Sequence, residues 1–296
     1  MRVAIVGATG LIGRRLTAAL HARGDEVVAV VRNGDRVEGA TTTVTWDATS
    51  AFPPSGLTGC EAVVNLAGAP IGRRWNAQIK QEILTSRIDL TRSLVAAIED
   101  GGPHTLVNAS AVGYYGNRSE EVDERAEPGS GFLAEVCTGW EREALAAQGH
   151  GARVVLLRTG VVLATDGGAL PQMLGPTKLG VGGPIAGGRQ WFPWIHIDDA
   201  VGLIVHALDT AAINGPINLV APGIVQQGAF ASALGRAVHR PAVVPTPAFA
   251  IRLMLGEGAQ LVLDGQHVVP AVARETGYTF RFPDVDAALT DLLAAP

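Results

Sequence analysis

The chain contains few residues that carry charge or sulfur, and these shortages exclude several classes of protein. Charged residues make up 17% of its 296 residues and hydrophobic residues 47%, a balance that excludes intrinsic disorder and charged coiled coils. Cys60 and Cys137 are its two cysteines, too few for a disulfide framework and without the spacing of a metal site. We therefore expect a globular cytoplasmic protein with two ordinary thiols and no metal.

Runs of positive charge and long apolar helices are also missing. The formal net charge is −5, and without a basic run the chain lacks the surface that attracts nucleic acids or anionic membranes. The longest uncharged stretch, residues 210–235, contains Pro216, Pro222 and several polar side chains, which a membrane-spanning helix does not tolerate. The apolar run over residues 3–6 is too short for a signal peptide. We expect neither nucleic acid nor membrane as a partner.

Short apolar runs alternate with helical patterns through the first half of the chain. Continuous runs of four to six such residues are typical of strands in a parallel sheet that is covered on both faces. The spacing also predicts helices over residues 11–23, ending at Gly24, and over residues 76–100. This alternation predicts an α/β fold with a Rossmann-type doubly wound parallel sheet. The predicted strands cover residues 3–6, 27–31, 43–46, 62–66, 105–109 and 154–157.

The alternation of strand and helix patterns stops after Arg158. The length of the chain also suggests two domains. Residues 166–188 are rich in glycine and proline, which predicts a long loop region. We expect a Rossmann domain over residues 1–160, to which residues 193–212 return, and a smaller C-terminal α/β substrate lobe over residues 161–296. The elements expected after the loop are a strand at 194–197, a helix from Asp198, strand-like pieces at 217–220 and 242–244, and helices near 230–238, 249–255 and 285–293.

A glycine-rich segment follows the first predicted strand and opens the first predicted helix. In this setting glycines let the backbone approach a pyrophosphate, whose charge lies at the helix N-terminus. A turn needed only for packing does not require three glycines at this spacing. We therefore expect dinucleotide binding at this turn. The expected contacts are Gly7, Thr9, Gly10, Leu11, Ile12 and Gly13.

The end of the second predicted strand indicates which dinucleotide is bound. An NAD-selective site usually offers Asp or Glu here to the ribose 2′-hydroxyl, whereas this chain has Arg32. A guanidinium suits a 2′-phosphate, and Arg36 could add a second contact. A solvated surface charge is the alternative for both residues. The sequence thus favours NADP(H) as the cofactor of the domain over residues 1–160.

Further motifs along nearly the whole chain carry a resemblance to a known family. The glycine spacing, Asp47 after the third strand, and Asn65-Leu66-Ala67-Gly68 after the fourth resemble extended, sugar-nucleotide-epimerase-like short-chain dehydrogenases/reductases. The chain is also similar to an atypical branch, the epimerase family proteins, often labelled cell-division inhibitors. The motifs behind this second resemblance are Arg73-Arg74-Trp75, Ser86-Arg87, residues 110–116, residues 132–137 with Trp140-Glu141, residues 192–199 and residues 263–266.

The resemblance implies further contacts to NADP(H). Arg87 stands where ordinary extended members have an active-site Asn, and Val162 stands where the backbone passes the nicotinamide. For Arg87 an ion pair with an acidic neighbour is the alternative, because helix arginines commonly form one. Besides the glycine turn and Arg32, the implied cofactor contacts are Asp47, Leu66, Ala67, Gly68, Glu82, Arg87 and Val162.

The catalytic pair that the family usually carries is absent. Family chemistry uses Ser with Tyr-x-x-x-Lys, in which the Lys lowers the pKa of the Tyr. None of the three tyrosines has a Lys four residues later. Aligning Glu141 with the glutamate that usually follows the pair places Leu133 at the Tyr position and Cys137 at the Lys position. We interpret Cys137 as a structural thiol, because no basic residue lies within one turn of it on its helix.

The hydroxyl-bearing residues that remain follow the fifth predicted strand. Ser110 matches the active-site Ser of the family to within one residue, and Tyr114 and Tyr115 lie just beyond it. Ligands of open α/β sheets bind at the carboxyl ends of the strands. We therefore take Ser110, Tyr114 and Tyr115 as the catalytic candidates, with packing over the cofactor as the alternative for the tyrosines.

Two further features near residues 191–198 have both a structural and a functional interpretation. His196 and Asp198 are expected to cap the next helix, with catalysis by His196 as the alternative. Trp191, Phe192 and Trp194 either wall a substrate pocket or belong to the core.

Two hypotheses for function follow from these residues. The first is an NADP(H)-dependent oxidoreductase or epimerase-like enzyme that holds a small polar substrate between its lobes. The second is a sensor or scaffold that binds NADP(H) without turnover, which the missing Tyr and Lys favour. The sequence names neither the substrate nor the reaction direction, and whether the chain forms a homodimer stays open.

Overall fold

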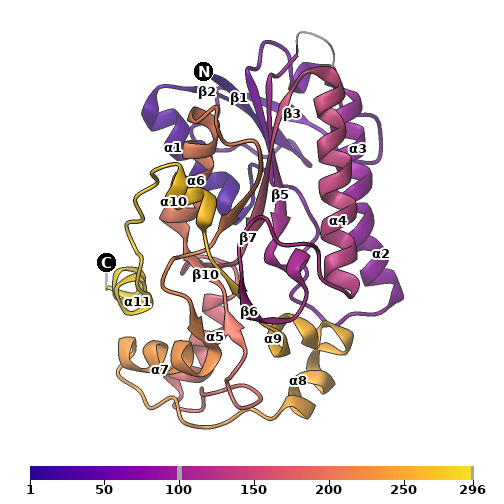
Figure 1. Ribbon diagram of the computed structural model, residues 1–296. Coiled ribbons are helices and arrows are strands. Elements are labelled where there is room, and N and C mark those ends of the chain that lie inside the picture. The colour runs from indigo at the N-terminus through magenta and orange to yellow at the C-terminus, as the bar shows by residue number, and fades with distance from the viewer. Residues whose placement is uncertain (99–101, 295–296) are drawn as a thin grey trace.

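The computed structural model describes residues 1–98 and 102–294, and its centre is a seven-stranded parallel sheet (Figure 1). The strand order is β11-β7-β5-β4-β1-β2-β3, so the chain winds outward from β1 in both directions, as in a doubly wound fold. All six runs predicted as strands lie in this sheet, and the predicted fold class is confirmed. The strands are β1 (Arg2–Val6), β2 (Glu26–Val31), β3 (Thr42–Thr45), β4 (Ala62–Asn65), β5 (Thr105–Ala111), β7 (Arg153–Thr159) and β11 (Gly215–Leu219).

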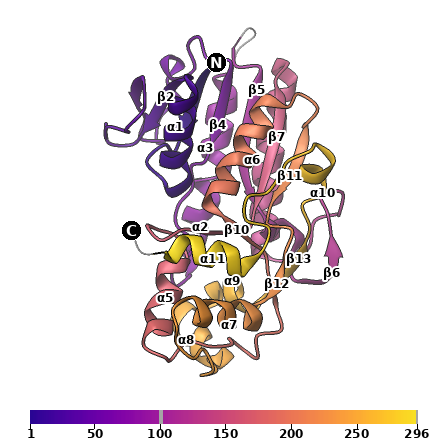
Figure 2. The ribbon, with the colours of Figure 1, turned by 90° about the vertical axis from the view of Figure 1, so that its left-hand side faces the viewer.

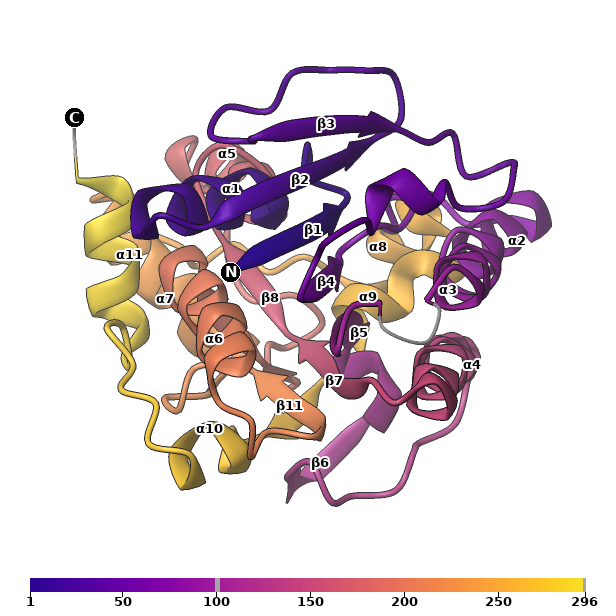
Figure 3. The ribbon, with the colours of Figure 1, turned by 90° about the horizontal axis from the view of Figure 1, so that it is seen from above.

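Helices cover both faces of the sheet because its strands are apolar on both faces. Along β1, Val3 and Ile5 share a buried cluster with residues of α1 and α6, whereas Ala4 and Val6 share one with residues of α3 and α4. Figure 3 shows these two pairs of helices on opposite sides of the sheet. The helices are α1 (Leu11–Arg23), α6 (Ile197–Asp209), α3 (Ile88–Ala96) and α4 (Phe132–Leu145).

Two helices replace the single helix predicted over residues 76–100, whose last two residues lie outside the described part of the chain. They are α2 (Ala77–Thr85) and α3. At the break, Ser86 Oγ accepts a hydrogen bond from the Ala69 amide at 3.0 Å, and Arg87 donates to the Ala69 carbonyl at 3.1 Å. These bonds join the break to the turn after β4, a contact that the helical spacing of apolar residues could not reveal.

Three expectations for the second half of the chain are wrong. Residues 166–188 contain a helix, α5 (Leu170–Lys178), and are not a loop throughout. Residues 217–220, expected in the C-terminal lobe, overlap β11, which pairs with β7 at the edge of the main sheet. Residues 242–244 form no strand. An apolar run shows that a strand is favourable but not which sheet it joins, because the choice depends on pairing partners far along the chain.

Most of the remaining elements lie below the carboxyl ends of the sheet strands (Figures 1 and 2). Their own core includes Leu170, Phe192, Trp194 and Phe230. The division into two domains stays a prediction, but this placement puts a second set of elements opposite the edge where ligands of such sheets bind. These elements are α5, α7 (Gln227–Ala237), α8 (Ala248–Leu255), α9 (Gln260–Leu263), α11 (Val285–Leu293), and the paired strands β8 (Val161–Leu163) with β10 (Trp194–His196), β9 (Trp191–Phe192) with β12 (Val225–Gln226), and β6 (Arg118–Val122) with β13 (Gln266–Val268). A short helix, α10 (Ala271–Glu275), contacts β11.

Two features are absent from residues 1–98 and 102–294. No helix there is long and apolar enough to cross a membrane. No group of three or more His, Cys, Asp or Glu side chains gathers there in a way that could hold a metal ion.

Candidate functional site

The glycine turn between β1 and α1 leaves too little room for a side chain at Gly7 or Gly13. A Cβ on Gly13 would lie 2.3 Å from the Gly7 carbonyl oxygen, and one on Gly7 would lie 3.1 Å from the Ala67 amide nitrogen. Gly7 also has φ +85°, a conformation that favours glycine. The turn therefore packs its own backbone at Gly13 and approaches the turn after β4 at Gly7.

The N-terminus of α1 is open to a ligand with negative charge. Gly10 caps the helix without a side-chain hydrogen bond, and the first turn contains no acidic residue. Thr9 and Gly10 are exposed, and Leu11 and Ile12 are half-buried. Amide groups at a helix start that lack a capping side chain, together with the helix dipole, form a site for a phosphate. The backbone here fits the pyrophosphate of a dinucleotide.

Val162 lies close to this helix start. A Cβ on Gly168 would lie 3.4 Å from the Val162 carbonyl oxygen and 3.2 Å from Leu11 Cδ2. Arg15 holds the same loop through Asp166, with 3.1 Å between Nη2 and Oδ1. The structure therefore brings Val162 and Leu11, which are distant in sequence, to one place at the sheet edge.

Arg32 and Asp47 lie at the carboxyl ends of the neighbouring strands β2 and β3. The Trp46 amide donates to the Val31 carbonyl at 2.8 Å, which keeps the two strand ends together. Both Arg32 and Asp47 are exposed. Asp47 accepts hydrogen bonds from the amide and hydroxyl of Thr49, and these bonds hold its pKa below the usual range. A cation and an acceptor thus lie two and three strands away from β4, respectively.

The turn Leu66-Ala67-Gly68 after β4 is fixed by buried polar groups. Asn65 Oδ1 accepts from the Ala67 amide at 3.3 Å, while its Nδ2 donates to Asn108 Oδ1 at 2.7 Å. Leu66 and Ala67 are half-buried and Gly68 is exposed. The buried Asn65 side chain thus fixes the orientation of the turn, and Gly68 stays exposed at the surface.

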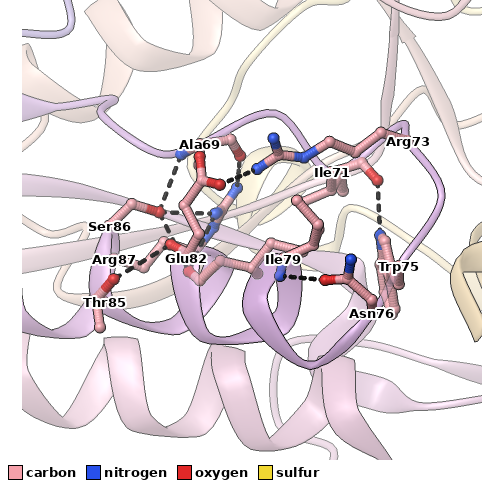
Figure 4. Close-up of polar contacts among 11 residues, drawn as sticks. Ala69, Ile71, Arg73, Trp75, Asn76, Ile79, Glu82, Thr85, Ser86 and Arg87 are labelled. Carbon is pink, nitrogen blue, oxygen red and sulfur yellow. Dashed lines mark hydrogen bonds and ion pairs between the residues drawn. The ribbon is translucent and has the colours of Figure 1, made fainter.

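Arg87 supports the same turn and does not form the ion pair considered as its alternative. Among the described residues no carboxylate pairs with Arg87, which donates to the carbonyls of Ala69 and Ile83 (Figure 4). Its guanidinium lies 5.2 Å from the Trp140 ring centroid, and burial lowers its pKa. Glu82 pairs instead with Arg73, at 2.6 Å.

Ser110 lies at the end of β5 in a buried polar network. Its hydroxyl donates to Glu141 Oε1 at 2.6 Å, and both side chains are buried. Glu141 in turn accepts from Arg158 at 2.9 Å through each of its oxygens. The Ser110 hydroxyl is therefore held by α4 beneath the sheet edge.

The two adjacent tyrosines have different surroundings. Tyr115 is fully buried, donates to Asn218 Oδ1 at 2.7 Å and accepts from Arg158 Nη1 at 3.1 Å. Burial raises its pKa to about 12. Tyr114 is half-buried, and the Arg158 guanidinium lies 3.4 Å from its ring centroid. Burial raises the pKa of Tyr114 as well. Tyr115 is thus enclosed in the network, whereas Tyr114 lies at its edge.

Arg158 and Asn218 are members of this network that the sequence reasoning missed. Ser110 pairs with Arg158 across β5 and β7, and Arg158 pairs with Asn218 across β7 and β11. The three polar residues therefore stand side by side at one level of three adjacent strands. The available signal was that Arg158 directly follows the apolar run over residues 154–157 and that Asn218 stands between Ile217 and Leu219.

The positions of the lost Tyr and Lys are apolar. Leu133 packs against Gly113: a Cβ added to Gly113 would lie 3.1 Å from Leu133 Cβ. Cys137 is buried, and burial raises the pKa of its thiol to about 11. A thiol with this pKa is protonated at neutral pH and is a poor nucleophile. The geometry supports a structural role for Cys137.

His196 and two of the three aromatic residues near it belong to the framework. His196 is buried, caps α6 by accepting the Asp198 amide at Nδ1, and stacks on Phe282 with 3.9 Å between centroids. Phe192 and Trp194 are buried in the core of the C-terminal elements. Trp191, which is half-buried, stacks on His267 with 3.9 Å between centroids.

The strand order and the glycine turn define a dinucleotide-binding α/β protein. Comparison with known families identifies it further. Residues 3–219 match the NAD dependent epimerase/dehydratase family, and residues 246–292 match a domain of unknown function, DUF1731. The chain belongs to the NAD-dependent epimerase/dehydratase family.

Relatives of similar length occur in distant organisms. The chain is 42% identical to the epimerase family protein SDR39U1 of Mus musculus, over 99% of this chain and 100% of the relative. It is 42% identical to the chloroplastic SDR39U1 homolog of Arabidopsis thaliana, over 99% and 87%. It is 38% identical to the epimerase family protein YfhF of Bacillus subtilis, over 99% and 98%. The resemblance to the epimerase family proteins is confirmed.

Solved structures are similar over the whole chain. The crystal structure of human SDR39U1 (isoform 2) with NADPH has a TM-score of 0.89 and 39% identity, and covers 99% of each chain. A UDP-glucuronic acid 4-epimerase from Bacillus cereus, solved with UDP-glucuronic acid and NAD, has a TM-score of 0.80 at 18% identity and covers 99% of each chain. The second likeness shows a shared fold alone.

Proposed function

We propose that the protein is an NADP(H)-dependent enzyme of the extended short-chain dehydrogenase/reductase type, an oxidoreductase or epimerase that acts on a small polar substrate. One observation carries the proposal: the turns that follow β1, β2 and β4 lie side by side at the carboxyl ends of these neighbouring strands. They offer a glycine turn at an open helix N-terminus, a cation and a second close backbone turn, which together suit a dinucleotide. The human relative that was solved with NADPH supports the choice of cofactor. The substrate would lie between this edge and the C-terminal elements over residues 161–296.

The residues at this edge fit the separate parts of NADP(H). The N-terminus of α1, with Gly7, Gly10 and Gly13, would hold the pyrophosphate. The exposed Arg32 would pair with the 2′-phosphate, since β2 ends without the acid that an NAD-selective site offers. When bound, NADPH supplies the hydride that a reduction requires.

The catalytic candidates remain Ser110, Tyr114 and Tyr115. Tyr114 is the half-buried member of the three, and it lies against the Arg158 guanidinium. A phenol that reaches the surface of the site can donate a proton to substrate, whereas an enclosed phenol such as Tyr115 cannot reach it. We therefore favour Tyr114 as the proton donor, with Ser110 and Tyr115 supporting it through the network around Arg158.

A sensor or scaffold that binds NADP(H) without turnover is the second candidate. It is favoured by the enclosed hydroxyls of Ser110 and Tyr115 and by the apolar Leu133 and Cys137 at the family's Tyr and Lys positions. For either function we propose a cytoplasmic location, with no nucleic acid or membrane partner.

Nicotinamide absorbance distinguishes the two functions. Purified protein is mixed with NADPH and a panel of aldehydes, ketones and quinones, and oxidation of NADPH is followed. Steady oxidation that falls in the Arg32→Asp variant supports the enzyme, because a contaminating reductase would not respond to that change. Tight NADPH binding without oxidation across the panel supports the sensor.

A further inference from the structure

Arg73 and Glu82 form an ion pair beside the turn that follows β4 (Figure 4). Arg73 Nη2 lies 2.6 Å from Glu82 Oε2, with side-chain exposures of 36% and 47%. Arg73 comes from the connection between β4 and α2, and Glu82 from α2 itself. Neither Nη2 nor Nε of Arg73 has a hydrogen-bond partner among the described residues, so the contact with Glu82 is an ion pair without hydrogen-bond geometry, and Nε is a buried free donor. Such a donor is uncommon in folded proteins and calls for an explanation.

The position of this pair assigns it to one half of the cofactor site. Arg32 lies at the end of β2, and β4 lies on the other side of β1 in the sheet order. Glu82 shares α2 and its C-terminal break with Arg87, whose guanidinium lies over Trp140 of α4. Helix α4 packs against β5, still further from β2. With the 2′-phosphate at Arg32, the Arg73–Glu82 pair flanks the half that carries the nicotinamide.

We propose that Arg73 is a positioning residue of the cofactor site and acts through Glu82. Arg73 neutralises the Glu82 carboxylate and fixes its direction, so that Glu82 can accept hydrogen bonds from ribose hydroxyls. A carboxylate without its arginine would also repel the phosphate on the nicotinamide side of the cofactor. This inference rests on the proposed function, because it takes NADP(H) as the ligand.

Arg74, the next residue, provides a matched control. Its guanidinium donates to the Leu253 carbonyl of α8, and Glu82 pairs with Arg73 instead. Arg74→Gln removes the same charge one residue along and leaves the pair intact. A long-range effect of net charge would therefore appear in both variants, whereas an effect through Glu82 would appear in Arg73→Gln alone.

The test is a double-mutant cycle on NADPH affinity, measured by the fluorescence of bound NADPH. We expect Arg73→Gln to weaken NADPH binding about fivefold, the upper range for an exposed ion pair. Arg74→Gln should change it less than about twofold, and Arg73→Lys should recover part of the loss. The Arg73→Gln/Glu82→Gln double variant should bind no more weakly than Glu82→Gln alone, since the unpaired carboxylate is then gone.

A second ligand distinguishes positioning from structural damage. 2′,5′-ADP contains the adenosine half alone, so its affinity should be unchanged in Arg73→Gln, whereas a disturbed fold would weaken both ligands. Equal effects of Arg73→Gln and Arg74→Gln, additive effects in the cycle, or equal weakening of both ligands would overturn the inference. If the unchanged protein binds no NADPH, the proposed function fails, and this inference fails with it. If Arg73→Gln does not fold, Arg73→Lys, which keeps the charge but not the guanidinium, is used for the same comparison of NADPH and 2′,5′-ADP affinities.

Discussion

Arg158 and Glu141 form a two-pronged ion pair that is almost completely buried. Their side-chain exposures are 4% and 7%, and two parallel hydrogen bonds of 2.9 Å join them. Glu141 also accepts the Ser110 hydroxyl, and Arg158 also donates to Tyr115. One ion pair thus holds the hydroxyls of Ser110 and Tyr115, two of the three catalytic candidates.

Breaking this pair should destabilise the protein strongly. Arg158→Met leaves the Glu141 carboxylate buried without its partner, which typically costs about 3–5 kcal/mol. Arg92→Met is the control, because Arg92 is 55% exposed in its pair with Glu143, and exposed pairs contribute little to stability. Urea unfolding measures both variants. Similar losses in the two would contradict the role of the buried pair.

We expect replacement of Tyr115 to lower mainly stability and replacement of Tyr114 to lower mainly turnover. Tyr115→Phe removes a buried hydroxyl with two hydrogen bonds and should cost about 1–3 kcal/mol in stability. Tyr114→Phe should leave stability nearly unchanged and, if the protein is an enzyme, slow turnover about 10²- to 10⁴-fold. Thermal unfolding and NADPH oxidation are measured on both, together with Ser110→Ala. Full activity in all three variants would place the proton donor elsewhere.

A single methyl group should disrupt the glycine turn. Gly13→Ala places a Cβ 2.3 Å from the Gly7 carbonyl oxygen, so the turn must move and NADPH affinity should fall at least tenfold, about 1.4 kcal/mol. Gly149→Ala is the control, since no atom lies within 4 Å of the new Cβ. Calorimetry compares the two variants. Unchanged NADPH affinity in Gly13→Ala would be inconsistent with a pyrophosphate at this turn.

The Cys137 thiol should stay protonated in the folded protein. Burial raises its pKa to about 11 from an ordinary value of 9.0, so the folded state holds the proton more tightly than the unfolded state. Stability from this group is therefore present below pH 9 and declines as pH rises toward 11. At pH 8 a thiol reagent should modify Cys137 only after unfolding. Rapid modification of native protein, with Cys60→Ala used to isolate the signal, would show the thiol to be reactive.

The sequence predicted the parallel sheet because its evidence is local. Apolar runs such as residues 27–31 are typical of strands in a sheet that is covered on both faces. Gly24 follows the last residue of α1 with φ +91°, as expected of a glycine that ends a helix. The glycine turn was equally readable, since the close contacts of Gly10 and Gly13 with Gly7 lie within seven residues, although Gly7 also approaches the distant turn after β4. These features needed no knowledge of distant partners.

Other features depend on contacts between distant residues and escaped prediction. The break between α2 and α3 is held by bonds from Ser86 and Arg87 to Ala69. The joining of β11 to the main sheet depends on its pairing with β7. The network around Arg158 arises from the register of three strands. None of these can be read from periodicity, because each requires the fold to be known first.

Calorimetric titration with NADPH and NADH tests whether the carboxyl edge of this sheet is an NADP(H) site. The exposed Arg32 at the end of β2 should give NADPH a preference of one to two orders of magnitude, about 1.5–3 kcal/mol. Arg32→Asp should erase or reverse this preference while leaving the fold intact. Equal affinities for the two cofactors in the unchanged protein, or no binding of either, would contradict the assignment.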